Sequence, residues 1–107
     1  MAQPIFKISA LTDAVGVVFR LIEFEIPGGV TSPSEFAAAV TEIAPELAGK
    51  LPILLNGRGP VWGYGMLLHE AHATPAVATF DPRLGYVVVQ SHDRRFQVGQ
   101  ILAGLNT

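Results

Sequence analysis

The chain has 107 residues, with nine acidic and seven basic side chains, three histidines and no cysteine, so its formal charge is −2. Half of the residues are apolar and only 15% are charged, which excludes a disordered chain and favours a domain that buries apolar surface in its core or between subunits. The lack of cysteine excludes disulfide scaffolds, thiolate zinc sites and cysteine nucleophiles. We therefore expect a single α/β domain over residues 1–107.

No apolar run reaches the ~18–20 residues that span a bilayer, and residues 1–7 lack the basic and apolar regions of a secretion signal. We expect a cytoplasmic protein with no membrane partner. Residues 1–57 carry six acidic and three basic side chains, whereas residues 58–107 carry four arginines, three acidic side chains and all the histidines. A generic nucleic-acid coat needs a basic stripe, which is absent, but a small polyanion held by a few arginines remains compatible.

The first elements are expected to be two strands. Residues 15–26 alternate apolar and acidic side chains toward their end, which predicts one core face and one wet face, and residues 5–9 precede them as a shorter strand. Residues 12–14 suit the hairpin turn between the strands. Residues 27–29, Pro-Gly-Gly, end the second strand.

A helix should follow, because Ser32 and Glu35 form a capping box with proline at the first helical position. Pro45 should stop this helix near Ala44. The short apolar run 53–55 is typical of a strand buried on both faces.

A second helix is expected from about Val61 to Ala73. At ~100° per residue one of its sides is apolar and faces the core, whereas the other side carries Trp62, Gly65, His69 and His72.

Three further strands are expected over residues 76–80, 86–90 and 96–102, with residues 81–85 as a tight turn between the first two. The expected order is β-β-α-β-α-β-β-β. This order indicates an α/β (α+β) domain in which two helices pack on a mixed sheet.

The loop Gly57-Arg58-Gly59-Pro60 lies between a strand and a helix start, where free backbone N–H groups and the helix dipole favour an anion. It lacks the Gly-Lys-Ser/Thr ending of a Walker loop. A plain connector with one exposed arginine is the alternative.

His69 and His72 are three residues apart on the expected helix, so their imidazoles face the same way. They could hold a transition metal or act as acid and base, or they could be ordinary polar side chains. Asp81 stands in a tight turn, where a local side-chain bond is common, and Arg83 could simply neutralise it. His72 precedes and Asp81 follows the strand 76–80, so the two should lie roughly 15–25 Å apart within one subunit. If they cooperate, their site is shared between subunits.

Several segments occur in a distinctive order and spacing between residues 57 and 92. Together they resemble the CRISPR-associated Csx-three family, also called CRISPR ring nuclease three. The segments are Gly57-Arg58-Gly59-Pro60-Val61-Trp62, the pair His69 and His72, Thr74-Pro75, Asp81-Pro82-Arg83-Leu84-Gly85 and Val87-Val88-Val89-Gln90-Ser91-His92.

The resemblance implies a ferredoxin-like homodimer that acts in type III CRISPR immunity. Members of this family bind the second messenger cyclic tetra-adenylate and cleave it, usually with manganese, to linear di-adenylates. This cleavage switches off the nucleases that the messenger activates. Dimers are expected to assemble further around the ring, with one face binding and another cutting.

The resemblance also implies residue roles. His72 and Asp81 are the expected catalytic residues and manganese ligands. The expected ligand-binding residues are Arg58, His69, Arg83, Ser91 and His92. In the reaction, a 2′-hydroxyl attacks its neighbouring phosphorus, with His72 as base or metal ligand, Asp81 as metal ligand or orienter, and Arg83 as phosphate clamp.

Three other functions use the same sequence differently. A metal-dependent exonuclease that removes 3′ adenosines from RNA would use the same residues. A non-catalytic module for short RNA or cyclic oligonucleotides would need Arg58, Trp62 and Arg83 but neither His72 nor Asp81. A structural dimerisation domain would need none of them.

Overall fold

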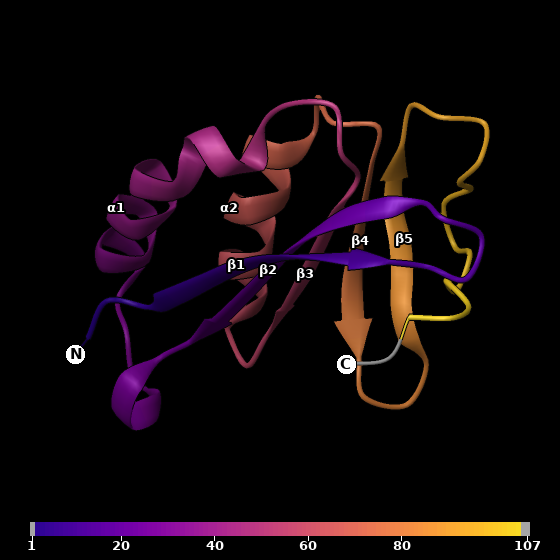
Figure 1. Cartoon of the computed structure of the whole chain (residues 1–107). Coiled ribbons are helices and arrows are strands. Elements are labelled where there is room, and N and C mark those ends of the chain that lie inside the picture. The colour runs from indigo at the N-terminus through magenta and orange to yellow at the C-terminus, as the bar shows by residue number, and fades with distance from the viewer. Residues whose placement is uncertain (1, 106–107) are drawn as a thin grey trace.

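Residues 2–105, which the structure describes, form a mixed sheet of five strands with two helices (Figure 1). The structure is a computed structural model. In sequence order, which is also their order in the sheet, the strands are β1 (Ile5–Thr12), β2 (Val18–Glu25), β3 (Ile53–Gly57), β4 (Ala76–Asp81) and β5 (Gly85–Ser91). The helices are α1 (Pro33–Ile43) and α2 (Val61–Ala71), and two 3-10 turns cover Pro27–Gly29 and Ala44–Leu47.

The parallel strands lie in the middle of the sheet. Strands β2, β3 and β4 are parallel because α1 and α2 each return the chain from the end of one strand to the start of the next. Strands β1 and β5 pair antiparallel at the two outer positions. The expected mixed sheet with two helices is confirmed. Its element order, β-β-α-β-α-β-β, differs from the β-α-β-β-α-β order of the ferredoxin-like arrangement that the resemblance implies.

One face of the sheet packs against the helices. Side chains alternate along each strand, so Ile22 of β2, Leu55 of β3 and Val77 of β4 point to the same side, where they are fully buried. Phe36 of α1 and Leu67 of α2 are fully buried in the same cluster. The apolar side predicted for the second helix is therefore confirmed as its core side.

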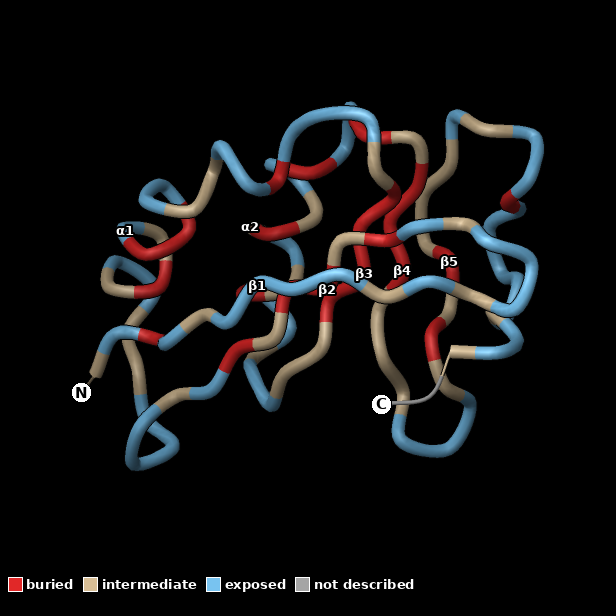
Figure 2. The backbone as a smooth tube through the Cα atoms, viewed as in Figure 1, coloured by how far each residue is buried: buried red, intermediate tan, exposed pale blue. Residues whose placement is uncertain are grey.

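The opposite face is covered by the C-terminal segment, residues 93–105, which lies beside β5 in Figure 1. Phe19 and Leu21 of β2 are buried on this face with Phe96. The wet face predicted for the second strand therefore exists only toward its end, at Glu23 and Glu25 (Figure 2).

The local signals in the N-terminal half are confirmed. The Asp13 carboxylate accepts the N–H groups of Val15 and Val17 at 3.0 and 2.9 Å, which closes the predicted hairpin turn. The Ser32 hydroxyl accepts the N–H of Glu35 at 3.2 Å and caps α1, and that helix ends immediately before Ala44 as expected.

The strand expected over residues 96–102 is wrong. This segment makes turns and a single bridge, Val87 with Ile101, rather than a continuous ladder. Gly99 has a φ of +94°, a left-handed conformation that interrupts a strand, and the N–H of Gln100 bonds to the carbonyl of Gln97 at 2.9 Å. Within the described chain, no helix is long and apolar enough to cross a membrane.

Two glycines of α2 make a matched test of the packing between the helices. A Cβ at Gly63 would lie 2.8 Å from the ring of the fully buried Phe36, whereas a Cβ at Gly65 would meet nothing within 4 Å. We expect Gly63→Ala to lower the free energy of unfolding by about 1–3 kcal/mol through overpacking. Gly65→Ala should raise it by about 0.5–1 kcal/mol through helix propensity. Urea denaturation of both variants measures the two effects, and equal effects of the same sign would contradict this packing.

Candidate functional site at two ends of the sheet

The predicted site residues fall into two groups at opposite ends of the β4–β5 hairpin. Ala76 pairs with Ser91 at one end of this hairpin and Asp81 pairs with Gly85 at the other. The arrowheads of β4 and β5 in Figure 1 point to these two opposite ends. We call them the histidine end, which holds His69, His72, Ser91 and His92, and the arginine end, which holds Arg58, Asp81 and Arg83.

At the histidine end, His72 lies just after the last residue of α2. Its Nδ1 lies 2.8 Å from the carbonyl oxygen of His69, one of the helix-terminal carbonyls that lack a partner within the helix. Because a carbonyl only accepts, Nδ1 donates this hydrogen bond, and in the neutral ring the lone pair is then on Nε2. The exposed rings of His69 and His72 stack, with centroids 5.9 Å apart. The Nε2 atom of His72 is thus free to act as a base or a metal ligand.

Two side chains at the end of β5 also bond to the carboxyl end of α2. The carbonyl oxygen of His72 accepts the Nε2–H of His92 at 2.9 Å and a hydrogen bond from the side-chain amide of Gln90. Both nitrogens are donors, so their mutual distance of 3.3 Å reflects convergence on one oxygen. In the neutral ring of His92 the lone pair is then on Nδ1.

Gln90 was not among the predicted site residues. Gln90 lies near the end of β5, two positions before His92. In an extended chain this spacing puts two side chains on one face, and this was the available signal.

Ser91 shapes the turn that follows β5. Its hydroxyl accepts the N–H of Asp93 at 3.1 Å and lies within hydrogen-bond distance of the carbonyls of Asp93 and Phe96, at 2.8 and 2.7 Å. A ligand-binding role for Ser91 stays a prediction.

At the arginine end, Asp81 stabilises the turn between β4 and β5. Its Oδ1 accepts the N–H groups of Arg83 and Leu84 at 2.8 and 3.1 Å. These hydrogen bonds, helped by the charge of Arg83, hold the pKa of Asp81 below its ordinary value, so the carboxylate is ionised at neutral pH. The Arg83 guanidinium is 4.0 Å from Oδ1 and 89% exposed, which leaves it free to meet an anion.

Arg58 follows the end of β3, which is the neighbour of β4 and runs parallel to it. Because Leu55 pairs with Thr79, Arg58 and the turn at Asp81 both lie just beyond the carboxyl ends of their strands, at the same end of the sheet. The exposed Arg58 lines two hollows of about 450 and 400 Å³, and in the described residues it makes no ion pair. Both readings of this loop, anion site and connector, stay compatible with this geometry.

The shape of the Arg58 loop depends on close packing. The hydroxyl of Tyr64 in α2 accepts the N–H of Gly57 and donates to its carbonyl, which ties the loop to the helix. Burial raises the pKa of Tyr64, so the hydroxyl keeps its proton for this bond. A Cβ at Gly57 or Gly59 would lie 2.5 Å from atoms of Phe24, which explains both glycines.

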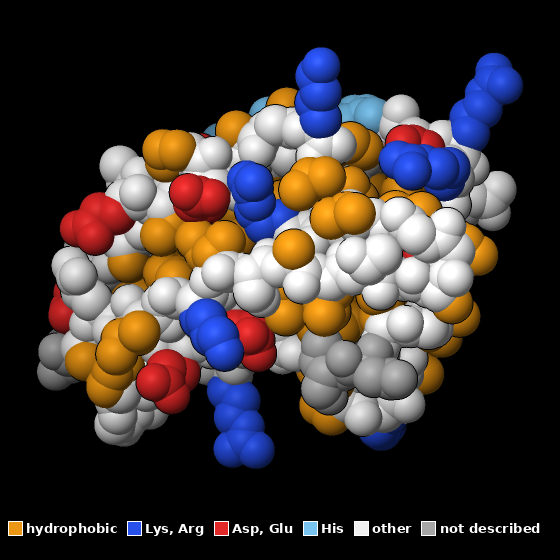
Figure 3. Space-filling model, viewed as in Figure 1, with side chains coloured by type: hydrophobic (Ala, Val, Ile, Leu, Met, Phe, Trp, Pro, Cys, Tyr) orange, Lys and Arg blue, Asp and Glu red, His pale blue; other side chains and the backbone are white. Residues whose placement is uncertain are grey.

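The two ends do not meet within one chain. His72 and Asp81 are separated by the whole six-residue strand β4, and among residues 2–105 no group of three or more potential metal ligands is assembled. In Figure 3 the visible histidine side chains lie along the upper edge of the molecule, where two lysine or arginine side chains also project, and a further basic side chain projects from the lower edge.

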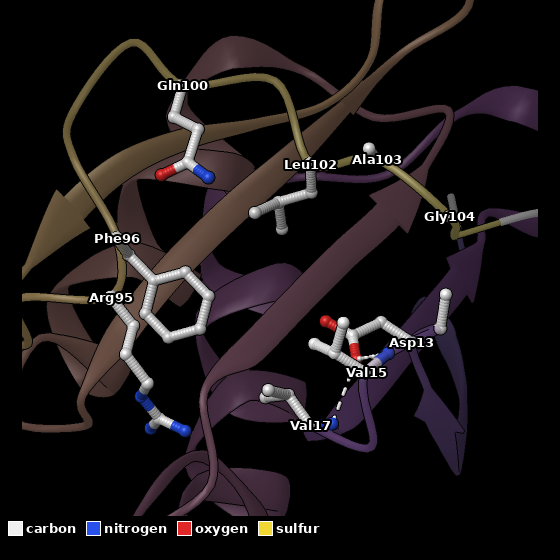
Figure 4. Close-up of a pocket in the computed structure, with 10 residues that line it drawn as sticks. Asp13, Val15, Val17, Arg95, Phe96, Gln100, Leu102, Ala103 and Gly104 are labelled. Carbon is white, nitrogen blue, oxygen red and sulfur yellow. Dashed lines mark hydrogen bonds between the residues drawn. The ribbon is translucent and has the colours of Figure 1, made fainter.

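A separate pocket of about 410 Å³ lies between the β1–β2 turn and the C-terminal segment (Figure 4). Val15, Val17, Phe96 and Leu102 make its lining mainly apolar. Its one guanidinium, Arg95, is engaged by Asp93 at 2.8 Å. The pocket contains none of the predicted site residues.

The fold and the two ends define a small α+β domain with histidine and arginine–carboxylate groups exposed at opposite edges. A family model described as CRISPR-associated protein (Cas_csx3) matches residues 31–103, which is more than half of the chain and includes every predicted site residue. The chain belongs to this CRISPR-associated family.

The chain is also similar to an uncharacterized protein of Aquifex aeolicus (strain VF5). The two are 51% identical over 51 residues, which are 47% of this chain and 46% of that protein. The match therefore spans less than half the length of this relative.

The lowered pKa of Asp81 gives a prediction for acid solution. Because the folded-state pKa is lower than the ordinary 3.8, the ionised carboxylate stabilises the fold above that pH, and this contribution disappears as pH falls through the folded-state pKa. Asp81→Asn keeps an acceptor oxygen for the turn but has no charge to titrate. We expect the Tm difference between wild type and Asp81→Asn to shrink between pH 5 and pH 2. Thermal unfolding followed by circular dichroism measures it, and a difference that grows on acidification would contradict the assignment.

Proposed function

We propose that this protein is a ring nuclease that binds cyclic tetra-adenylate and cleaves it to linear di-adenylates. Membership of the CRISPR-associated family supports the biological setting. The single observation that carries the chemistry is the placement of a free imidazole nitrogen at one end of β4 and an ionised carboxylate beside an exposed arginine at the other.

The catalytic site is formed between two copies of the chain, end to end. One copy supplies the histidine end and the other supplies the arginine end, since β4 keeps the two apart in each copy. A polyanionic ring placed between the copies would meet the imidazoles on one side and Arg58 and Arg83 on the other. The homodimer and the larger assembly expected from the sequence belong to this proposal.

The reaction is cleavage of a phosphodiester by its own 2′-hydroxyl. The Nε2 of His72 takes the hydroxyl proton, the 2′-oxygen forms a bond to phosphorus, and the bond from phosphorus to the 5′-oxygen breaks. A proton returns to the leaving 5′-oxygen, so each cut leaves one cyclic phosphate and one 5′-hydroxyl. The planar guanidinium of Arg83 suits the charge that develops on the phosphate oxygens. Two cuts on opposite sides of the ring give two di-adenylates.

Manganese fits the donor atoms at the two ends. The Oδ2 of Asp81 accepts no hydrogen bond from the described residues. The single lone pair on Nε2 of His72 can bind the ion or accept the hydroxyl proton but not both, so His72 is a manganese ligand only where it is not the base. A hard carboxylate oxygen together with imidazole nitrogen suits this ion. Bound manganese would supply Lewis-acid stabilisation to a phosphate oxygen.

The activity is tested by incubating the protein with cyclic tetra-adenylate, with and without manganese, and separating the products by chromatography. We expect linear di-adenylates. His72→Ala and Asp81→Asn should slow cleavage by at least ~10²-fold, the usual scale for acid–base groups. Arg83→Ala should also weaken binding of the ring, because the clamp contacts phosphate in the ground state.

Arg94→Ala is the matched control, since it removes an exposed arginine that makes no hydrogen bond or ion pair among the described residues and has no part in the proposed reaction, so activity should stay unchanged. An intact ring after prolonged incubation at high protein concentration would contradict the proposal. Shortening of RNA at its 3′ adenosines with an intact ring would assign the same residues to an exonuclease. Binding of the ring with no product under any metal condition would indicate a non-catalytic module.

A further inference from the structure

The carboxyl end of α2 exposes carbonyl oxygens that need donors from outside the helix. The carbonyl of Ala71 accepts the N–H and the hydroxyl of Thr74, at 3.0 and 2.7 Å, so the loop that follows the helix satisfies it. The carbonyl of His72 instead accepts hydrogen bonds from Gln90 and His92, which are 18 and 20 residues away in the sequence. The backbone of His72 is thus held from β5. In Figure 1 α2 and β5 end at the same upper edge of the molecule.

Strand β5 contains one extra residue just before these two side chains. Along β4, Ala78 pairs with Val88. The residue before it, Val77, pairs with Gln90 rather than with Val89, so Val89 is the extra residue of a β-bulge. A bulge bends its strand and changes the direction of the side chains that follow, and bulges are frequent next to active sites.

The bulge determines on which face of the sheet Gln90 lies. Side chains of paired residues lie on the same face, and Val77 is buried under the helices, so Gln90 lies on the helix side. Strict alternation from Val88, which is buried on the opposite face, would have placed Gln90 on that opposite face. Ser91 returns to the opposite face, in agreement with its hydrogen bond to the carbonyl of Phe96 at 2.7 Å.

The two hydrogen bonds from β5 also constrain the ring of His72. Because Gln90 and His92 engage both lone pairs of the His72 carbonyl, the peptide group that follows His72 is fixed. The ring donates from Nδ1 to the carbonyl of His69 while His72 keeps its helical backbone angles, φ −64° and ψ −21°. That hydrogen bond sets the tautomer of the neutral ring and leaves the lone pair on Nε2.

We propose that Gln90 is a positioning residue for His72. Its amide fixes the backbone of His72 and thereby the orientation and the tautomer of the imidazole. This role rests on the proposed function, in which Nε2 of His72 is the base or a metal ligand. Gln90 acts through His72 and touches neither the substrate nor the metal. Side chains that orient metal ligands in this way contribute about 10–100-fold to activity or metal affinity.

Kinetics separate positioning from substrate binding. Gln90→Met keeps the length of the side chain and removes the donor. We expect kcat for cleavage of cyclic tetra-adenylate to fall about 10–100-fold while KM changes by less than about 2-fold. Gln97→Met is the matched control, because Gln97 is exposed, its side chain makes no hydrogen bond among the described residues, and kcat should stay unchanged. An unchanged kcat in Gln90→Met, or a raised KM with unchanged kcat, would overturn the proposal.

Nuclear magnetic resonance measures the same role without the reaction. The ¹⁵N shifts of the two ring nitrogens show which of them carries the proton, and His72→Ala assigns the signals. At about pH 9, where ordinary imidazoles are neutral, we expect the proton of wild-type His72 on Nδ1. In Gln90→Met the two shifts should move toward each other because the tautomers exchange, whereas Gln97→Met should match wild type. Unchanged His72 shifts in Gln90→Met would overturn the positioning role.

A second variant keeps the size of the side chain. In Gln90→Glu an ionised carboxylate, which only accepts, faces the carbonyl of His72, so both effects should recur. If circular dichroism shows that Gln90→Met does not fold, Gln90→Glu decides, and wild-type kcat together with wild-type His72 shifts in this variant would overturn the proposal. A wild type that leaves the ring intact would contradict the proposed function alone, and the His72 shifts then decide on Gln90.

Discussion

The length of β4 is the constraint on which the proposed chemistry depends. This strand is paired on both sides, and Ala76, Val77 and Ala78 are nearly inaccessible to solvent, so it can neither bend nor shorten without loss of the core. At about 3.3 Å per residue the first and last residues of this strand, Ala76 and Asp81, are about 16–17 Å apart, and His72 precedes Ala76 by four residues. No side-chain rotation closes that distance. A reaction that needs both groups must therefore recruit a second copy.

The histidine end and the arginine end carry different chemical groups because a helix ends at one of them and parallel strands end at the other. A helix end exposes carbonyl oxygens, and histidine N–H groups cap them, which leaves the other ring nitrogens with free lone pairs. The opposite edge holds the carboxyl ends of parallel strands, the usual place for ligands in sheets of this kind. There the turn fixes an ionised Asp81 and leaves Arg83 exposed. Imidazole groups thus lie at one end of the domain, and an ionised carboxylate with two exposed arginines lies at the other.

Local signals in the sequence predicted much of this arrangement. The Ser32 cap, the hairpin turn at Asp13 and the position of His72 before β4 all depend on neighbouring residues. The last predicted strand failed because Gly99 turns the chain, and apolar alternation alone does not reveal a positive φ. Gln90 was missed because its partner, the carbonyl of His72, is 18 residues away, and only the packing of β5 against the end of α2 brings them together.

The shared site is tested most directly by mixing two inactive variants. His72→Ala keeps an intact arginine end and Asp81→Asn keeps an intact histidine end, so some end-to-end pairs in the mixture contain one complete site. We predict that cleavage of cyclic tetra-adenylate returns in this mixture. It should stay absent when either variant is mixed with the double variant, which has no intact end. A mixture that remains inactive despite demonstrated exchange of subunits would contradict a site formed between copies.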